Sequence, residues 1–407
     1  MKKKILFVDD EPNVLDGLRR VLRGVRPEWE MEFCPSAQHA LEILEGKPFD
    51  VMVTDMRMPG MDGCELLEKV KALHPQVVRI ILSGHSDRDL ILSSLGLAHQ
   101  FLSKPCDGEA LKAIVSRACA MRELLEDQSL VEIVSSIDSL PSLPTLYKEV
   151  IEEANSEDGS LERIGEIISK DAGMSAKLLQ LVNSAFFGLA AKVTSTVRAV
   201  NLIGLETIKA LVLSVKIFSE FDRPGMPSVS TLWDHSLLTG MIARSIATQE
   251  DLAQNQIDEA FTAGLLHDVG KLILLDKLPG KYREIIALSG ETECTLWEAE
   301  QTALSTTHAH VGAYLMGIWG LSGSMVEAIA YHHFPGKCLN TVFSTLTAVH
   351  LADCAEHDSR GESNRDRLDI GYLEKLGISE RIQESLTVPR DSSGKALGDG
   401  RKNTFCR

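Results

Sequence analysis

The first hundred residues alternate short β-rich apolar runs with stretches in which apolar residues recur every three or four positions. The apolar runs are 5–8, 31–34, 51–54, 78–82 and 100–102. Between them, residues 12–22, 37–44, 64–73 and 89–95 have the spacing of helices with one buried face, and a fifth helix begins near Gly108. Strands that alternate with helices in this way predict α/β architecture, with a doubly wound parallel sheet of five strands.

From about residue 132 onward the pattern changes to helical segments separated by turns rich in Gly, Pro and Asn. Residues 122–126 keep helical spacing, so the last helix of the sheet domain is expected to continue as a connector. After residue 386 apolar residues are too few to offset the entropy of ordering. The predicted organisation is an α/β domain at 1–122, a helical connector at 123–131, an all-α domain at 132–345, a C-terminal helical segment at 346–385 and a disordered tail at 386–407.

Composition narrows the possible partners. The 407 residues carry a formal net charge of −16, which argues against a surface that binds nucleic acid directly. No apolar run reaches the length of a membrane-spanning helix, and Asp9-Asp10-Glu11 interrupts the first apolar run too early for a signal peptide. The eight cysteines form no C-x-x-C pair, so we expect reduced thiols in a cytoplasmic protein that does not insert into membranes.

Polar residues follow the predicted strands. Asp9 and Asp10 follow the first strand, Asp55 the third, Ser83 the fourth and Lys104 the fifth, and in a parallel sheet these ends share one edge. Three carboxylates so close would repel one another unless a hard cation neutralised them, which points to Mg²⁺. An aspartate beside Mg²⁺ can attack a phosphoryl group, although any one of these aspartates alone could simply cap a helix or turn.

These residues resemble the receiver domain of two-component systems. The resemblance covers about the first 120 residues and includes Asp9-Asp10, Asp55, Met58-Pro59-Gly60-Met61-Asp62-Gly63, Ser83-Gly84 and Lys104-Pro105. It implies that Asp55 is the phosphoacceptor, that Asp9 and Asp10 complete the acidic Mg²⁺ pocket, and that Ser83 and Lys104 respond to the phosphoryl group. It also implies a cognate sensor histidine kinase as partner and homodimerisation on activation.

A second group of ionisable residues lies in apolar surroundings. The run Ala263-Gly264-Leu265-Leu266-His267-Asp268-Val269-Gly270-Lys271 places a His-Asp pair on an otherwise apolar helix, which is costly without a partner. Imidazole and carboxylate together suit Mn, Fe, Ni or Zn. Hydrogen-bonded core histidines are the alternative interpretation. Further candidate ligands are His235, His308, His332, His333 and Asp353.

The order of these residues resembles the HD phosphohydrolase superfamily, whose helical bundle holds one or two metal ions and hydrolyses phosphoester bonds. By this resemblance the single-metal set is His235, His267, Asp268 and Asp353. The second-metal positions match His308, His332 and His333. Lys271 matches a lysine of cyclic-di-GMP phosphodiesterases and would be catalytic only if the domain is a phosphohydrolase. Those enzymes continue into Gly-Tyr-Pro, whereas this chain continues into Phe334-Pro335-Gly336.

Segments before the His-Asp pair resemble the HDOD output domain, a relative that is regarded as a signalling module. They are Leu140-Pro141-Ser142-Leu143-Pro144, Ile168-Ser169-Lys170-Asp171-Ala172-Gly173-Met174, Val182-Asn183-Ser184-Ala185-Phe186-Phe187-Gly188 and Ala199-Val200-Asn201-Leu202-Ile203-Gly204. The resemblance runs from about residue 132 to 340.

Together, the two resemblances predict a response regulator whose output domain acts on downstream signalling proteins mainly through protein interaction. The alternative is a phosphorylation-regulated, metal-dependent phosphodiesterase that acts on a cyclic (di)nucleotide, favoured by the complete ligand series. A helix-turn-helix over 196–215 is disfavoured, because the segment has no cluster of polar or basic residues that could read DNA.

Overall fold

The computed structural model describes residues 2–83, 94, 96–104, 107–137, 140, 144–156, 159–183, 192–205, 208, 229–292, 294–338, 342–360 and 367–378. The chain forms two compact units. The first comprises Met1–Ser139, Gln180–Lys192 and Tyr314–Leu321, and the second comprises Leu140–Leu179, Val193–Ala313 and Ser322–Arg407. Apart from Ser94, the helix predicted over 89–95 lies outside the described residues, as does the tail predicted over 386–407.

The N-terminal sheet has five parallel strands, as the pattern predicts, and the structure places them in the order β2-β1-β3-β4-β5. The strands are β1 (Lys3–Val8), β2 (Trp29–Cys34), β3 (Val51–Asp55), β4 (Val78–Ser83) and β5 (Gln100–Ser103). The chain passes from β1 to β2 on one side and then returns through β3 to β5 on the other. This reversal makes the sheet doubly wound and brings the ends of β1 and β3 together.

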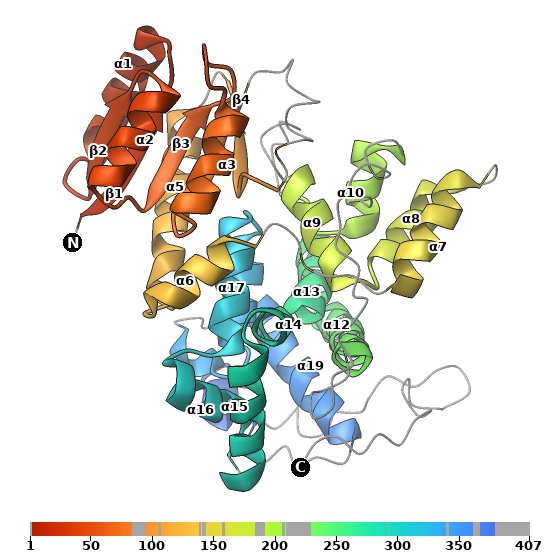
Figure 1. Cartoon of the computed structure of the whole chain (residues 1–407). Helices are drawn as coiled ribbons and strands as arrows, with labels where there is room; N and C mark the ends of the chain where they lie inside the picture. Colours follow the sequence, from red (N-terminus) through yellow and green to blue (C-terminus); the bar gives the residue numbers. More distant parts are fainter. Residues whose placement is uncertain are drawn as a thin grey trace. The chain divides into compact units, whose positions relative to one another are not determined.

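Helices cover both faces of this sheet (Figure 1). They are α1 (Pro12–Val21), α2 (Ala37–Gly46), α3 (Gly63–Leu73) and α5 (Gly108–Met121). Side chains of Ser36, Asp62 and Asp107 accept hydrogen bonds from the first turns of α2, α3 and α5, which fixes where these helices begin. The strands contribute fully buried residues such as Ile5 and Val53, so the sheet is the core of the domain.

The connector is not one continuous helix, which corrects the expectation for residues 122–131. Helix α5 ends at Met121, a 3-10 turn spans Arg122–Leu124, and Leu125 is extended and buried. A new helix, α6 (Gln128–Ser135), then begins because the Asp127 carboxylate accepts a hydrogen bond from the Ser129 amide. An N-cap at this point favours a fresh helix start over continuation of α5.

The rest of the described chain is helical, as predicted. Its α-helices are α7 (Pro144–Asn155), α8 (Leu161–Ile168), α9 (Ala172–Val182), α10 (Thr196–Ile203), α12 (Val229–Gln249), α13 (Gln254–Leu266), α14 (Val269–Lys277), α15 (Pro279–Thr292), α16 (Leu296–Leu304), α17 (His308–Ile318), α18 (Gly323–Tyr331), α19 (Thr345–Ser359) and α20 (Ile370–Lys375). Across the described ranges, none of the helices has the length and apolar character needed to cross a membrane.

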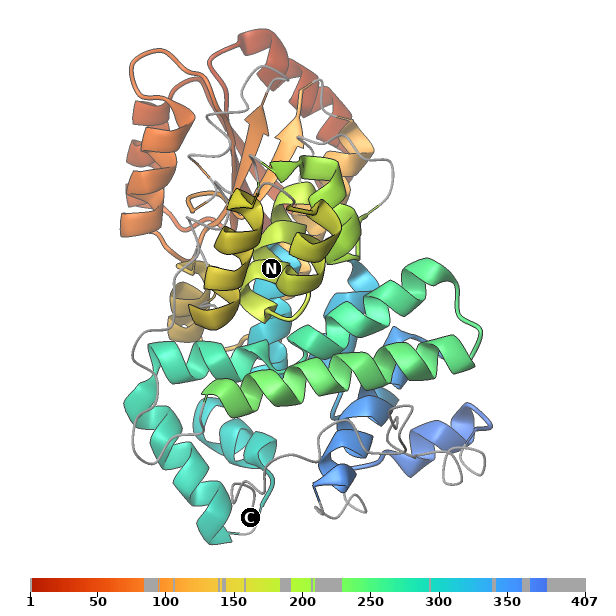
Figure 2. The same ribbon diagram turned by 90° about the vertical axis from the view of Figure 1, so that its right-hand side faces the viewer.

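Helices α12, α13, α18 and α19 pack against one another and form the centre of the helical bundle. Figure 2 shows the two green helices α12 and α13 lying against each other. Asp353 lies in the middle of α19, so the segment after residue 345 contributes directly to this bundle.

Glycine residues allow the backbones of neighbouring helices in this bundle to come into contact. A Cβ atom on Gly264 of α13 would lie 2.8 Å from the Gly240 Cα atom of α12. A Cβ atom on Gly270 of α14 would lie 1.9 Å from the carbonyl oxygen of His308, the first residue of α17. The polar residues on these helices are therefore held closer together than larger side chains would permit.

Candidate functional site

The acidic residues predicted at the edge of the sheet come together. One carboxylate oxygen each from Asp9, Asp10 and Asp55 lies within 4.8 Å of the others. Asp9 and Asp55 are buried, and the Lys104 ammonium group donates to Asp9 Oδ2 at 2.7 Å and contacts Asp55 Oδ1 at 2.5 Å. One lysine beside three carboxylates leaves excess negative charge, which suits a divalent cation with oxygen ligands.

Burial raises the pKa of Asp55, and this effect exceeds the opposing hydrogen bond and charge of Lys104. For Lys104, burial acts to lower the pKa, but the Asp55 and Asp9 carboxylates outweigh it and raise the pKa above its ordinary value. The lysine is therefore held in its charged form next to Asp55, where it can balance negative charge on an attached phosphoryl group.

The backbone around Asp55 is tightly constrained. A Cβ atom on Gly63 would lie 2.2 Å from the Asp55 carbonyl oxygen, so only glycine fits at the start of α3. The Arg57 amide donates to Asp55 Oδ2 at 3.2 Å. Ser83 is buried at the end of β4, and its carbonyl oxygen accepts a hydrogen bond from the Lys104 amide at 2.7 Å. All five predicted residues thus lie at the carboxyl ends of strands, as expected.

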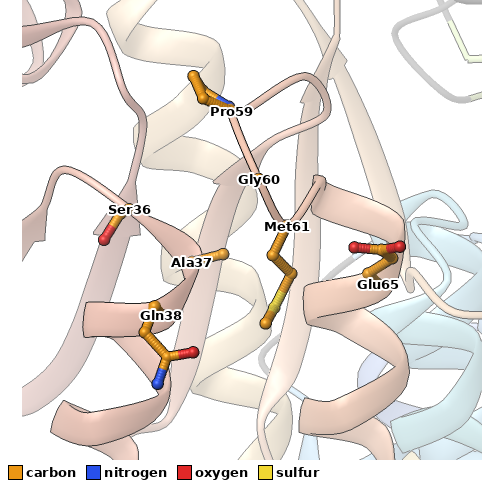
Figure 3. Close-up of a pocket in the computed structure, with 7 residues that line it drawn as sticks. All are labelled: Ser36, Ala37, Gln38, Pro59, Gly60, Met61 and Glu65. Carbon is orange, nitrogen blue, oxygen red and sulfur yellow. The ribbon is translucent and has the colours of Figure 1, made fainter.

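A surface hollow of about 440 Å³ lies near the first turn of α2 and the loop before α3 (Figure 3). Its lining includes Ser36, Gln38, Met61 and Glu65, but none of the acidic cluster or Lys104. The candidate phosphorylation site is therefore separate from this hollow.

The seven metal-ligand candidates of the helical unit also come together. Around the first position, His235 Nε2 lies 3.1 Å from His267 Nε2, 3.4 Å from Asp268 Oδ2 and 3.3 Å from Asp353 Oδ1. Metal bonds of about 2.1 Å place neighbouring ligand atoms about 3.0 Å apart in an octahedral site and about 3.4 Å apart in a tetrahedral site. These four donors therefore have the spacing of a coordination sphere.

A second position lies on the other side of Asp268. The Oδ1 atom of Asp268 is 3.2 Å from His308 Nε2 and 3.9 Å from His332 Nε2. His308 Nε2 is in turn 3.0 Å from His333 Nε2. The two oxygens of Asp268 thus face different groups of histidines. This geometry allows one carboxylate to bridge two metal ions.

The hydrogen bonds around the histidines suit a bound cation. His267 Nδ1 must carry a proton, because it donates to the Gly264 carbonyl oxygen, and His235 Nδ1 likewise faces the Glu356 carboxylate. The two Nε2 lone pairs then face each other at 3.1 Å, which is repulsive unless a metal ion or proton lies between them. Among the described residues, His332 Nε2 is also buried without a hydrogen-bond partner. The residues present therefore fit a metal centre.

The charges of this cluster are strongly perturbed. Burial acts to lower the pKa of His235, but Asp268, Asp353 and Glu356 raise it well above its ordinary value. Burial, together with neighbouring histidines, lowers the pKa of His332 and His333 well below the usual range. Histidines that stay neutral have a free lone pair for a metal ion.

Lys271 and the aspartates complete the charge distribution. Burial acts to raise the pKa of Asp268, but His267 and Lys271 lower it well below its usual value. Burial also acts to raise the pKa of Asp353, but His357 and His235 outweigh burial and lower that pKa well below its usual value. The Lys271 ammonium group lies 2.6 Å from Asp268 Oδ2, within reach of the site.

Three residues near the site were not singled out from the sequence as ligands. Glu300 and Glu356 are fully buried and hydrogen-bond to His308 and His235. His357 lies 3.5 Å from Asp353 Oδ1 and belongs to a candidate ligand group with His235 and Asp353. His350 is structural, because its ring contacts the His332 carbonyl oxygen and accepts from the Asp369 amide. The three- and four-residue spacing of Glu356 and His357 from Asp353 on α19 is the signal that could have identified them.

Comparison with known proteins accounts for both parts of the chain. The response regulator receiver domain family matches residues 5–116, and the HDOD domain family matches residues 140–335. An uncharacterized protein of Treponema pallidum is 27% identical over 259 residues, which are 63% of this chain and 50% of that protein. The DNA-binding transcriptional regulator NtrC of Escherichia coli is 37% identical over 123 residues, 29% of this chain and 25% of that protein.

The chain thus spans about half the length of the first of these relatives and a quarter of the second. Among solved structures, the MmoQ response regulator of Methylococcus capsulatus is 22% identical, with 62% of this chain and 98% of that chain covered and a TM-score of 0.47. The two family matches follow each other along the chain and coincide with the sheet and the helical bundle. The chain therefore belongs to the response regulators in which a receiver domain is followed by an HDOD domain.

Proposed function

We propose that this protein is switched by phosphorylation of Asp55 by a cognate sensor histidine kinase. The observation that carries the proposal is the buried Asp55 carboxylate, which shares its surroundings with Asp9, Asp10 and the Lys104 ammonium group. We also propose that the protein works in the cytoplasm, that activation is accompanied by homodimerisation, and that it does not bind nucleic acid directly.

Each residue of the cluster has a separate role in transfer of the phosphoryl group from the donor to Asp55. An Asp55 oxygen attacks the phosphorus atom of the donor, and the donor's leaving group departs with its own bonding electrons. Lys104 balances the negative charge of the transferred phosphoryl group, and the Ser83 hydroxyl group donates a hydrogen bond to a phosphoryl oxygen. Asp9 and Asp10 are the residues that would hold Mg²⁺ next to Asp55, and the ion would neutralise charge on the phosphoryl oxygens.

Asp55→Asn is expected to abolish phosphorylation by acetyl phosphate in the presence of Mg²⁺, because the amide cannot form the acyl phosphate. Phosphate-affinity electrophoresis would measure this directly. Asp62→Asn is the matched control, since Asp62 caps α3 and asparagine caps a helix equally well. Phosphorylation of the Asp55→Asn protein at the parent rate would contradict the assignment.

For the helical unit we propose a signalling module that acts on downstream proteins and holds metal ions at the His-Asp cluster. The spacing of the donor atoms, with the Nε2 atoms of His235 and His267 facing each other at 3.1 Å, supports occupancy by a cation. His235, His267, Asp268 and Asp353 would hold one ion, while His308, His332, His333 and Asp268 would hold the other. Fe, Mn, Ni and Zn suit this set of nitrogen and oxygen donors.

A second candidate function is a metal-dependent phosphohydrolase that acts on a cyclic (di)nucleotide. The specific observation in its favour is that Asp268 presents one oxygen to each group of histidines, with Lys271 at 2.6 Å. Two metal ions held by these residues would supply the charge stabilisation that phosphoester hydrolysis uses. The test is hydrolysis of cyclic dinucleotides by protein loaded with each metal. Turnover that disappears in His267→Ala and Asp268→Ala would favour the enzyme, and metal-loaded protein without turnover would favour the signalling module.

A further inference from the structure

The histidines of the metal-ligand cluster are held in two different ways. His267 and His332 each direct Nδ1 to a backbone carbonyl oxygen three residues earlier, at 2.7 Å from Gly264 and 2.8 Å from Ile329. His235 and His308 instead direct Nδ1 to the carboxylates of glutamates from other parts of the chain. Each proposed metal position thus contains one histidine backed by a carbonyl group and one backed by a carboxylate.

Glu356 supports the first position. It lies on α19, three residues after Asp353, and its Oε2 atom is 2.6 Å from His235 Nδ1. The carboxylate is fully buried, and its other oxygen accepts from Arg360 Nε at 2.5 Å. The arginine fixes the rotamer of Glu356, so the carboxylate can hold the His235 ring in one orientation.

Glu300 supports the second position. It lies on α16 and is fully buried, and its Oε2 atom accepts from the His308 amide at 2.8 Å and lies 2.7 Å from His308 Nδ1. Its Oε1 atom accepts from the buried Tyr282 hydroxyl group at 2.7 Å. Glu300 therefore fixes both the backbone and the ring of His308.

We propose that Glu356 and Glu300 are positioning residues, one for each of two metal positions, and that each controls the affinity of its own position. A carboxylate that accepts from Nδ1 fixes the tautomer with a free Nε2 lone pair and makes the imidazole a stronger electron donor. Backbone carbonyls fix the same tautomer without adding negative charge. The inference rests on the metal centre proposed above and extends it to groups that do not touch the ions.

The test is a metal titration of the full-length apoprotein with Mn²⁺ and Zn²⁺ against a competing chromophoric chelator. Glu356→Gln is expected to weaken binding of one ion by about 10- to 100-fold and to leave the other unchanged. Glu300→Gln is expected to weaken the other ion by a similar factor. Glu284→Gln, at an exposed position of α15, is the matched control and should bind both ions as the parent does.

Electron paramagnetic resonance of the Mn²⁺ protein supplies an independent signature. At two equivalents of Mn²⁺ the parent should show a spin-coupled pair, whereas each glutamine variant should show an isolated Mn²⁺ ion. Tyr282→Phe and Arg360→Gln provide milder forms of the same perturbation if a glutamate variant does not fold. Each should weaken only the position served by the glutamate that it contacts.

The outcomes distinguish a failure of the metal centre from a failure of the positioning role of the two glutamates. If the parent binds no ion, the proposed metal centre itself fails. If the parent binds two ions and both glutamine variants match it, the metal centre stands and the positioning role is overturned. Loss of both ions in each variant would also overturn the assignment of one glutamate to each position.

Discussion

Asp268→Asn is expected to reduce the metal content of the protein from about two ions per chain to near zero. Asp268 offers one oxygen to each group of histidines, so this single change would remove a ligand from both proposed metal positions. Loss of a carboxylate that binds metal directly should exceed the roughly 10- to 100-fold effect of changing a group that only supports a ligand. Elemental analysis of protein purified without chelator would measure the effect.

Asp268→Asn is also expected to lower the free energy of unfolding of the metal-free protein. Lys271 lies 2.6 Å from Asp268 Oδ2, and removing one partner of a buried ion pair typically costs about 3 kcal/mol or more. Denaturant unfolding in the presence of chelator would measure this loss of stability separately from any effect of metal binding. Asp276→Asn, which alters a partly exposed pair with Lys277, should change neither stability nor metal content appreciably. An Asp268→Asn protein that retains one tightly bound ion would contradict the bridging role.

Gly270→Ala is the second large expected effect. The added Cβ atom would lie 1.9 Å from the His308 carbonyl oxygen and 2.9 Å from the Gly312 nitrogen, and backbone atoms cannot move aside without separating α14 from α17. We expect a loss of about 3 kcal/mol in the free energy of unfolding. Displacement of His308 should also weaken the second metal position, which metal titration would detect.

Gly290→Ala is a control with the opposite expected sign. Gly290 lies within α15, and a Cβ atom there would have nothing within 4 Å. Alanine in a helix interior is more favourable than glycine by about 0.5–1 kcal/mol, so this variant should be slightly more stable than the parent. If Gly270→Ala unfolded at the same denaturant concentration as the parent, the close approach of α14 and α17 would not hold in solution.

Local patterns in the sequence predict much of the fold. The five strands form within a few residues of their expected positions because each is a short apolar run with flanking helices of clear periodicity. The connector was predicted wrongly, since the helical spacing of 122–126 does not reveal that Leu125 turns inward and that Asp127 starts a new helix. Capping by Asp127 decides between two local structures that have similar periodicity.

The supporting groups of the metal-ligand cluster were harder to predict than the candidate ligands. The candidate ligands follow an order along the chain that resembles a known superfamily. Glu300 matches no such order. The turn between α16 and α17 brings it to His308, and tertiary packing brings it to Tyr282. His350 and His357 look alike in the sequence, because both lie on the same helix as Asp353. Only tertiary structure shows that the first is satisfied by backbone groups and the second faces the aspartate.

The distribution of the ligands along the chain has a consequence for unfolding. His235, His267, His308, His332 and Asp353 are far apart in sequence, and they lie on or directly after separate helices. Ions bound to them would act as cross-links that close long loops, and closure of long loops removes much conformational entropy from the unfolded chain. Metal occupancy would then determine how readily the bundle opens, so that proteolysis in the presence and absence of chelator would distinguish the two states.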